Sequence, residues 1–135
     1  MARTIVILVI IVSLLAIVVG YIRLAPSDPA DWHDMPEITD DAERPGEVER
    51  VVETGPDGLT RLADIALATP RTTLLAGSVD EGMMTFITRS RFWGFPDYTT
   101  ARQEGEKLKI YGRLRFGGSD MGVNKARVDG WIADL

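Results

Sequence analysis

One uninterrupted apolar segment near the amino terminus limits what this chain can fold into. Residues 4–22 contain no charged side chain, and isoleucine, valine and leucine dominate them. As an α-helix rising ~1.5 Å per residue, this segment is roughly 28 Å long, which matches the ~30 Å hydrocarbon core of a bilayer. Arg3 and Arg23 flank it, and Tyr21 has the position of an interfacial aromatic residue. The sequence therefore predicts a transmembrane anchor over residues 1–24.

This segment has two alternative interpretations. A buried core helix is disfavoured because the segment has no polar face to meet water. A cleaved signal peptide normally has a shorter apolar region followed by a small-x-small cleavage site. Here no A-x-A pattern follows, and Arg23 comes directly after the apolar run. The sequence favours an uncleaved anchor in the bilayer, and a cleaved signal peptide is the remaining alternative.

The charges at the two ends of the helix bear on its orientation. Lysine and arginine number one on each side, so the free amino terminus favours a cytoplasmic N-terminus. The downstream flank carries Asp28, Asp31 and Asp34. We therefore expect a bacterial inner-membrane protein whose C-terminal domain is periplasmic. The chain has no cysteine, which is compatible with that compartment.

Acidic residues are concentrated directly after the helix. Residues 28–64 hold twelve acids against three bases, a net of −9, whereas residues 65–135 hold eight acids against ten bases, a net of +2. Residues 25–46 are rich in proline and small residues, which predicts an irregular acidic neck. Anionic headgroups would repel this neck and hold the domain off the membrane; alternatively, its charges are simply solvated. Trp32 is expected to pack on the domain or at the membrane interface.

Residues 47–135 predict one α+β domain, because the length leaves room for no second one. Residues 47–54 resemble a strand, and an apolar stripe at helical spacing predicts a helix from Leu59 to Thr69, with Asp57 as N-cap. The period then changes to two in four segments joined by short turns. These segments are residues 72–78, 83–91, 97–103 and 107–116.

A final helix follows the glycine-rich turn at residues 117–120, with Asp120 as its N-cap. The predicted order is β-α-β-β-β-β-α. Short connections favour antiparallel neighbours, and the two amphipathic helices are available to cover one face of the sheet. The expected fold is therefore an antiparallel four- to five-stranded sheet with both helices on one face.

The residue types argue against most kinds of catalysis. His33 is the single histidine and cysteine is absent, which leaves little for zinc or thiol chemistry. No P-loop, dinucleotide-binding or nucleophile-elbow motif occurs. We expect a non-catalytic domain without metal or cofactor. Nucleic acid is an unfavourable partner for a net-acidic, membrane-tethered chain.

Basic side chains alternate along the last predicted strand and recur on its neighbours. They are Lys107, Lys109, Arg113 and Arg115, with Arg102 on the adjacent strand and Arg89 and Arg91 one strand further. If these faces coincide, converging guanidinium groups would suit phosphate or carboxylate. The alternative is a solvent-facing sheet surface whose charges pair with Glu104, Glu106 and Asp97.

Two segments carry a family resemblance: R-S-R-F-W-G-F-P-D-Y-T-T at residues 89–100, and G-R-L-R-F-G-G-S-D-M-G-V-N-K-A-R at residues 112–127. They resemble the domain of unknown function family fourteen-ninety-nine, and the short anchored form is similar to alphaproteobacterial members. The resemblance implies no agreed activity. It directs attention to candidate ligand-binding residues at matching positions, namely Arg89, Ser90, Arg91, Asp97, Tyr98, Arg113, Arg115, Ser119, Asp120, Asn124 and Arg127.

The same residues also admit a structural interpretation. Asp97 or Asp120 can neutralise Arg91 or Arg127, Asp120 can cap the last helix, and Asn124, on an apolar stripe, can satisfy buried backbone groups.

Three hypotheses of function follow. The first is a membrane-anchored periplasmic module, held in the bilayer through residues 4–22, that binds an anionic or amphipathic ligand such as an anionic lipid. The second is an accessory subunit of a larger inner-membrane complex, with Ser13, Ala16 and Gly20 as the small positions where another helix could pack. A third is an enzyme that uses the Arg, Asp and Tyr side chains of the motifs, which would require a concave pocket there.

Overall fold

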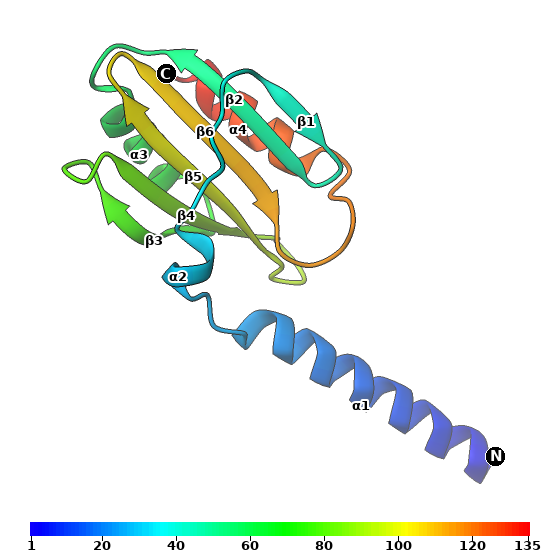
Figure 1. Cartoon of the computed structure of the whole chain (residues 1–135). Coiled ribbons are helices and arrows are strands. Elements are labelled where there is room, and N and C mark those ends of the chain that lie inside the picture. Colours follow the sequence, from blue (N-terminus) through cyan, green and yellow to red (C-terminus); the bar gives the residue numbers. More distant parts are fainter.

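A projecting helix and a two-layer domain make up the structure, a computed structural model that describes residues 1–135 (Figure 1). In chain order the elements are α1 Ala2–Leu24, α2 Pro29–Trp32, β1 Ala42–Arg44, β2 Glu47–Glu53, α3 Gly58–Ala68, β3 Thr72–Ser78, β4 Met83–Arg89, β5 Pro96–Glu104, β6 Lys107–Leu114 and α4 Val123–Ala133.

The strands form one antiparallel sheet in the order β1-β2-β6-β5-β4-β3. The predicted α+β class and antiparallel sheet are confirmed. The sheet has one strand more than expected, because β1 lies within the neck and pairs with β2, Ala42 opposite Glu49. Strand β4 ends earlier than predicted, at Arg89, since the amide of Ser90 donates to the carbonyl of Phe95 and closes a loop there.

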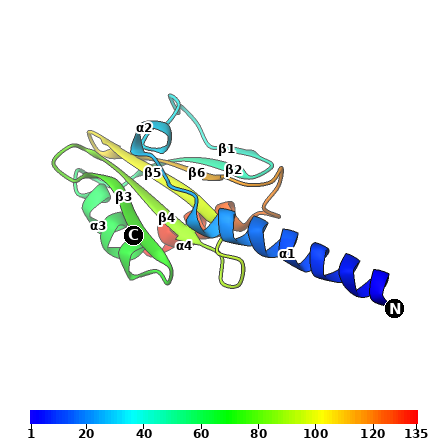
Figure 2. The ribbon, with the colours of Figure 1, turned by 90° about the horizontal axis from the view of Figure 1, so that it is seen from below.

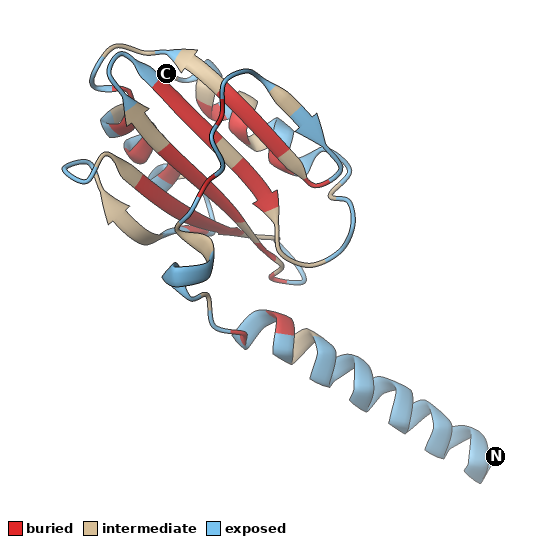
Figure 3. Ribbon diagram, viewed as in Figure 1, coloured by how far each residue is buried: buried red, intermediate tan, exposed pale blue.

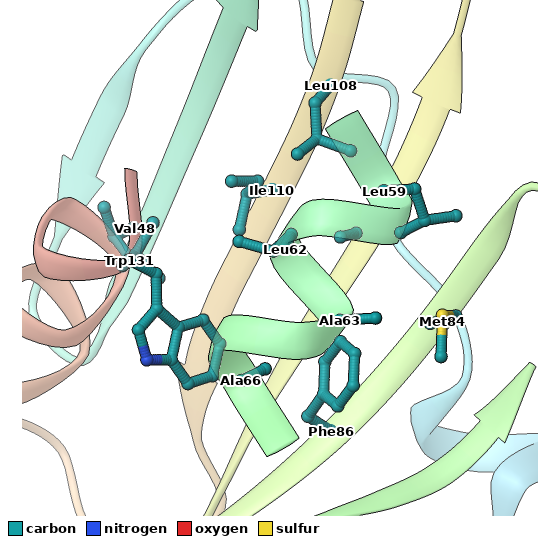
Figure 4. Close-up of a cluster of buried hydrophobic side chains, with 12 residues drawn as sticks. Val48, Leu59, Leu62, Ala63, Ala66, Met84, Phe86, Leu108, Ile110 and Trp131 are labelled. Carbon is teal, nitrogen blue, oxygen red and sulfur yellow. The ribbon is translucent and has the colours of Figure 1, made fainter. Parts of the chain in front are cut away.

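Helices α3 and α4 both cover one face of the sheet, as predicted, and the hydrophobic core lies between the two layers (Figure 4). Phe86 of β4 packs edge-to-face on Trp131 of α4, with ring centroids 6.2 Å apart. Gly112 of β6 allows α4 to approach, because a Cβ there would lie 2.9 Å from Val48 and 3.1 Å from Val128. The core is thus built from β-strand alternation on one side and two helical stripes on the other.

Before its last two turns, helix α1 is exposed along its length (Figure 3). It is long and apolar enough to cross a bilayer, and no residue of its most apolar stretch is buried. A membrane anchor and a signal sequence share these properties. Ile22, in its last turn, is where burial against the domain begins.

The neck, residues 25–46, differs from the irregular linker that its prolines predict. It contains α2 and β1, and it crosses the face of the sheet opposite α3 and α4 (Figure 1). Met35 and Ile38 are buried, and Trp32 stacks on Tyr98 of β5 at 4.0 Å between centroids. The proline breaks remain, but these apolar side chains between them have a sheet surface to cover. The expectation that Trp32 packs on the domain is confirmed.

Candidate functional site

The eleven candidate residues lie in three separate places. Under the neck lie Tyr98, Arg113 and Arg115; at the β4–β5 loop lie Arg89, Ser90 and Arg91; and around the start of α4 lie Asp97, Ser119, Asp120, Asn124 and Arg127. Asp97 and Tyr98 are neighbours on one strand, so their side chains point to opposite faces of the sheet. The Arg, Asp and Tyr residues of the motifs therefore do not form one cluster.

Arg113 is the centre of the group under the neck. Its guanidinium donates to Thr100 Oγ1 at 2.8 Å, to the carbonyl of Asp34 at 3.2 Å and to the carbonyl of Trp32. Burial lowers the pKa of Arg113 below its ordinary value. Arg115 donates to the carbonyl of Pro26 at 2.8 Å. These two arginines thus hold the chain's own neck, which occupies the face that alternation had marked as open to a ligand.

The acidic neck and the basic sheet surface are complementary. Glu37 pairs with Lys109 at 2.6 Å and with Arg102 at 3.0 Å, and the hydrogen bond from Lys109 lowers the pKa of Glu37. Lys109 also pairs with Glu104 at 2.7 Å, as expected for a paired surface. Asp97 does not join it, because it lies on the opposite face. Acidic charge of the neck therefore helps to bind the neck to the sheet and is not merely solvated.

The space left beside Arg113 is unsuited to anions. A pocket of about 490 Å³ lies between the neck and β6. Its charged residues include Asp31, Asp34 and Glu47, against Arg113 alone. Three carboxylates near one guanidinium would repel a phosphate or carboxylate ligand.

A hydrogen-bonded network joins the motif residues around α4. Arg127 contacts Asp97 at 3.3 Å and donates to Asn124 Oδ1 at 3.0 Å. Asn124, fully buried, donates through Nδ2 to Asp120 Oδ2 at 2.7 Å. Of the pairings that the sequence left open, Asp97 with Arg127 is the one present. The side chain of Asn124 bonds to the side chains of Asp120 and Arg127 and not, as expected from the sequence, to buried backbone.

Asp120 caps α4 from further upstream than predicted. Its carboxylate accepts the backbone amides of Gly122 at 2.9 Å and Asn124 at 2.8 Å. The residue in the N-cap position is Gly122, which has a left-handed φ of 81° that glycine adopts easily. Burial acts to raise the pKa of Asp120, but these hydrogen bonds together bring it below its ordinary value.

The pKa of Asp97 is shifted in the opposite direction to that of Asp120. Burial raises its pKa, and the attraction of Arg127 only partly offsets this. The 3.3 Å separation is long for a charge-assisted hydrogen bond, which agrees with a weak pair.

This pKa shift predicts that the difference in stability between the wild type and Asp97→Asn depends on pH. The folded state binds the Asp97 proton more tightly than the unfolded state, so wild-type stability relative to the variant is greatest below the unfolded pKa of ~3.9. It falls as the pH rises toward the folded pKa, by at most ~1.4 kcal/mol per pH unit, and is constant above it. Urea unfolding of both chains from pH 3 to pH 7 measures the difference, and a difference that grows with pH would contradict the assignment.

A mostly apolar pocket of about 370 Å³ opens beside this network; we call it the motif pocket. Asp97, Ser119 and Asp120 form its polar side. Its apolar side includes Phe116, whose ring meets Tyr21 of α1 edge-to-face at 6.2 Å. The pocket therefore lies next to the point where α1 meets the domain. Arg127 and Asn124 support its wall through Asp97 and Asp120.

A second pocket, of about 430 Å³, lies on the other side of the β4–β5 loop; we call it the arginine pocket. Arg23, Arg71 and Arg89 line it, and Arg91 lies outside, its guanidinium 5.5 Å from the ring centroid of Phe92. Arg89 was expected near a ligand. Arg23 and Arg71 were not, because only the tertiary fold places the end of α1 and the start of β3 beside the loop.

These features define a class of protein: an α+β domain attached to an apolar helix, with two pockets where the helix and the domain meet. No group of three or more histidine, aspartate or glutamate side chains is placed so that it could hold a metal ion. A family model described as "Protein of unknown function (DUF1499)" matches residues 22–135, and the chain belongs to this family. A comparison with curated proteins found no match.

Proposed function

We propose that this protein is a single-pass inner-membrane protein whose periplasmic, non-catalytic domain binds an amphipathic ligand in the motif pocket. One observation carries the proposal: a pocket with one polar and one apolar side opens where the apolar helix meets the domain. A molecule leaving or entering a bilayer beside α1 would meet this pocket first.

The lining of the motif pocket indicates the class of ligand. Phe95, Phe116 and Met121 offer apolar surface, and Met121 is almost fully exposed. Two carboxylates, Asp97 and Asp120, lie on the polar side and disfavour an anion there. The ligand that fits best is an amphiphile with an apolar body and a neutral or cationic polar group. This supports the amphipathic form of the hypothesis for this pocket, while the docked neck weakens the case for an anion on the outer sheet face.

Membrane location and orientation complete the proposal. The length and composition of α1 support a bilayer anchor, and the amino-terminal charge supports a cytoplasmic N-terminus. The docked neck is short and packed, so the domain would be held close to the membrane at a restricted angle.

Blocking the motif pocket should abolish co-purification of its ligand. Ser119→Trp enlarges an exposed residue at the pocket, and Lys125→Trp adds the same side chain to the exposed side of α4. We expect the wild-type chain and Lys125→Trp, isolated from membranes, to carry the same amphiphile in native mass spectrometry. Ser119→Trp should carry at least about tenfold less, since a filled cavity leaves the ligand no apolar surface. Equal occupancy of all three chains, or an empty wild type, would contradict the proposal.

The alternative function is an accessory subunit of a larger inner-membrane complex. Ala16 and Gly20 are one helical turn apart, and a Cβ at Gly20 would meet nothing within 4 Å, so this stripe of α1 is free to receive another helix. Extraction in mild detergent followed by sizing decides between the two: a defined larger species with a co-purified membrane protein supports a subunit, and a chain that runs alone counts against it.

A further inference from the structure

Three arginines without carboxylate partners meet where α1 joins the domain. Arg23, Arg71 and Arg89 line the arginine pocket, and no acidic residue lines it. Many other bases pair with a carboxylate, for example Arg50 with Asp129 and Arg44 with Glu49. Such a cluster of arginines makes the electrostatic potential at this concave surface positive, and a positive potential attracts an anion.

Backbone contacts hold these side chains in place. Arg71 Nε donates to the carbonyl of Arg89 at 3.0 Å, and Arg89 Nη1 donates to the carbonyl of Gly94 at 2.9 Å. Arg23 reaches across to the carbonyls of Phe92 and Trp93. Each guanidinium has five donors, so these bonds leave donors free. Arg71 also has a left-handed φ of 60°, a conformation that is unusual for a residue with a side chain.

The β4–β5 loop carries exposed aromatic side chains next to this pocket. Phe92 is 75% exposed and Trp93 59% exposed, although both are large and apolar. Through Arg23 the loop is fixed to the last turn of α1, and Figure 2 shows the loop beside that end of the helix. If α1 spans the bilayer, Arg23 marks its outer boundary, which is the depth at which tryptophan is enriched.

We infer that the arginine pocket binds the phosphodiester headgroup of an anionic phospholipid, with Phe92 and Trp93 inserted at the membrane interface. This inference rests on the membrane location proposed above, and it concerns a different site from the motif pocket. Guanidinium forks match phosphate oxygens in geometry and charge. A lipid is favoured over a free phosphate because the pocket lies at the end of an apolar span beside two exposed aromatic rings.

Competition between two lipids tests the inference in the full chain. The chain is extracted in nonionic detergent with equimolar phosphatidylglycerol and phosphatidylcholine of identical acyl chains, and native mass spectrometry gives the ratio of the lipids retained. We expect the wild type to favour phosphatidylglycerol by about tenfold or more, as for a specific charge-assisted site. The double variant Arg71→Gln/Arg89→Gln should bring this ratio close to unity.

Two controls separate the site from general charge and from misfolding. The double variant Arg44→Gln/Lys107→Gln removes the same charge from exposed residues elsewhere and should keep the wild-type ratio. Arg71→Lys/Arg89→Lys restores charge and should recover part of the preference. Tryptophan fluorescence during urea unfolding shows whether each variant is folded; if the Gln variant unfolds, Arg71→Gln alone is compared with Arg44→Gln.

The inference is overturned if the wild type retains both lipids alike, if Arg44→Gln/Lys107→Gln lowers the ratio as much as the pocket variant, or if equimolar inorganic phosphate displaces the lipid, which would indicate a free-phosphate site. Its failure is distinct from failure of the proposed function. If the chain stays in membranes and carries an amphiphile but shows no lipid preference, only the headgroup site is contradicted. If the chain is recovered without detergent, the proposed membrane location is contradicted.

Discussion

Replacing Phe86 with alanine is expected to lower the free energy of unfolding by about 3–5 kcal/mol. Phe86 is fully buried, and its ring packs against Trp131 and beneath α3. Truncation loses the transfer free energy of the ring and leaves a cavity that the rigid sheet cannot close. Urea unfolding of the full chain in detergent, followed by tryptophan fluorescence, measures the change, because Trp131 senses this part of the core.

Phe92→Ala is the matched control, since it removes the same side chain from a position that is 75% exposed. Its effect on unfolding should be within ~0.5 kcal/mol of zero. A comparable loss for the two variants would mean that Phe86 is not part of the core between sheet and helices.

Replacing Arg113 with alanine should lower the free energy of unfolding by about 2–3 kcal/mol and release the neck. The substitution leaves two neck carbonyls, those of Trp32 and Asp34, without their donor. It also removes the guanidinium 4.7 Å from the ring centroid of Tyr111. The loss is smaller than the sum of these contacts because burial already disfavours the charge of Arg113, as its lowered pKa indicates.

Hydrogen exchange of neck amides tests this prediction directly. In Arg113→Ala the amides of β1 should exchange faster than they do in the wild type, because β1 is an edge strand at the end of the neck; the amides of β6, an interior strand, should change less. Lys107→Ala, which removes an exposed base 3.6 Å from Glu53, should leave both exchange and stability nearly unchanged. Unaltered protection of the neck in Arg113→Ala would show that Trp32 and Ile38 are sufficient to hold it.

The docked neck changes the interpretation of the basic sheet face. Converging cations on a sheet surface are equally consistent with an external anion and with an internal acidic segment. Glu37 and the backbone carbonyls of the neck satisfy them internally. Arg23, Arg71 and Arg89 line a pocket that contains no carboxylate and that the neck does not fill, so this pocket is the better candidate for an anionic ligand.

Local patterns determined much of this protein. The period-two alternation of residues 107–114 and the helical spacing of residues 59–66 define β6 and α3, because burial on one face requires those periods. The apolar run of residues 4–22 likewise determines α1. Resemblance of the two motifs to a known family identified the residues that gather around α4, Asp97 and Asp120 among them.

Tertiary structure decided what the sequence left open. Neither composition nor spacing indicates that Trp32 stacks on Tyr98, or that Arg23 and Arg71 lie beside Arg89. These contacts join residues distant in the chain, and their partners are fixed only when the sheet offers a surface of matching shape and charge. Periodicity reports which side of an element is buried, whereas the identity of the segment that buries it depends on the whole fold.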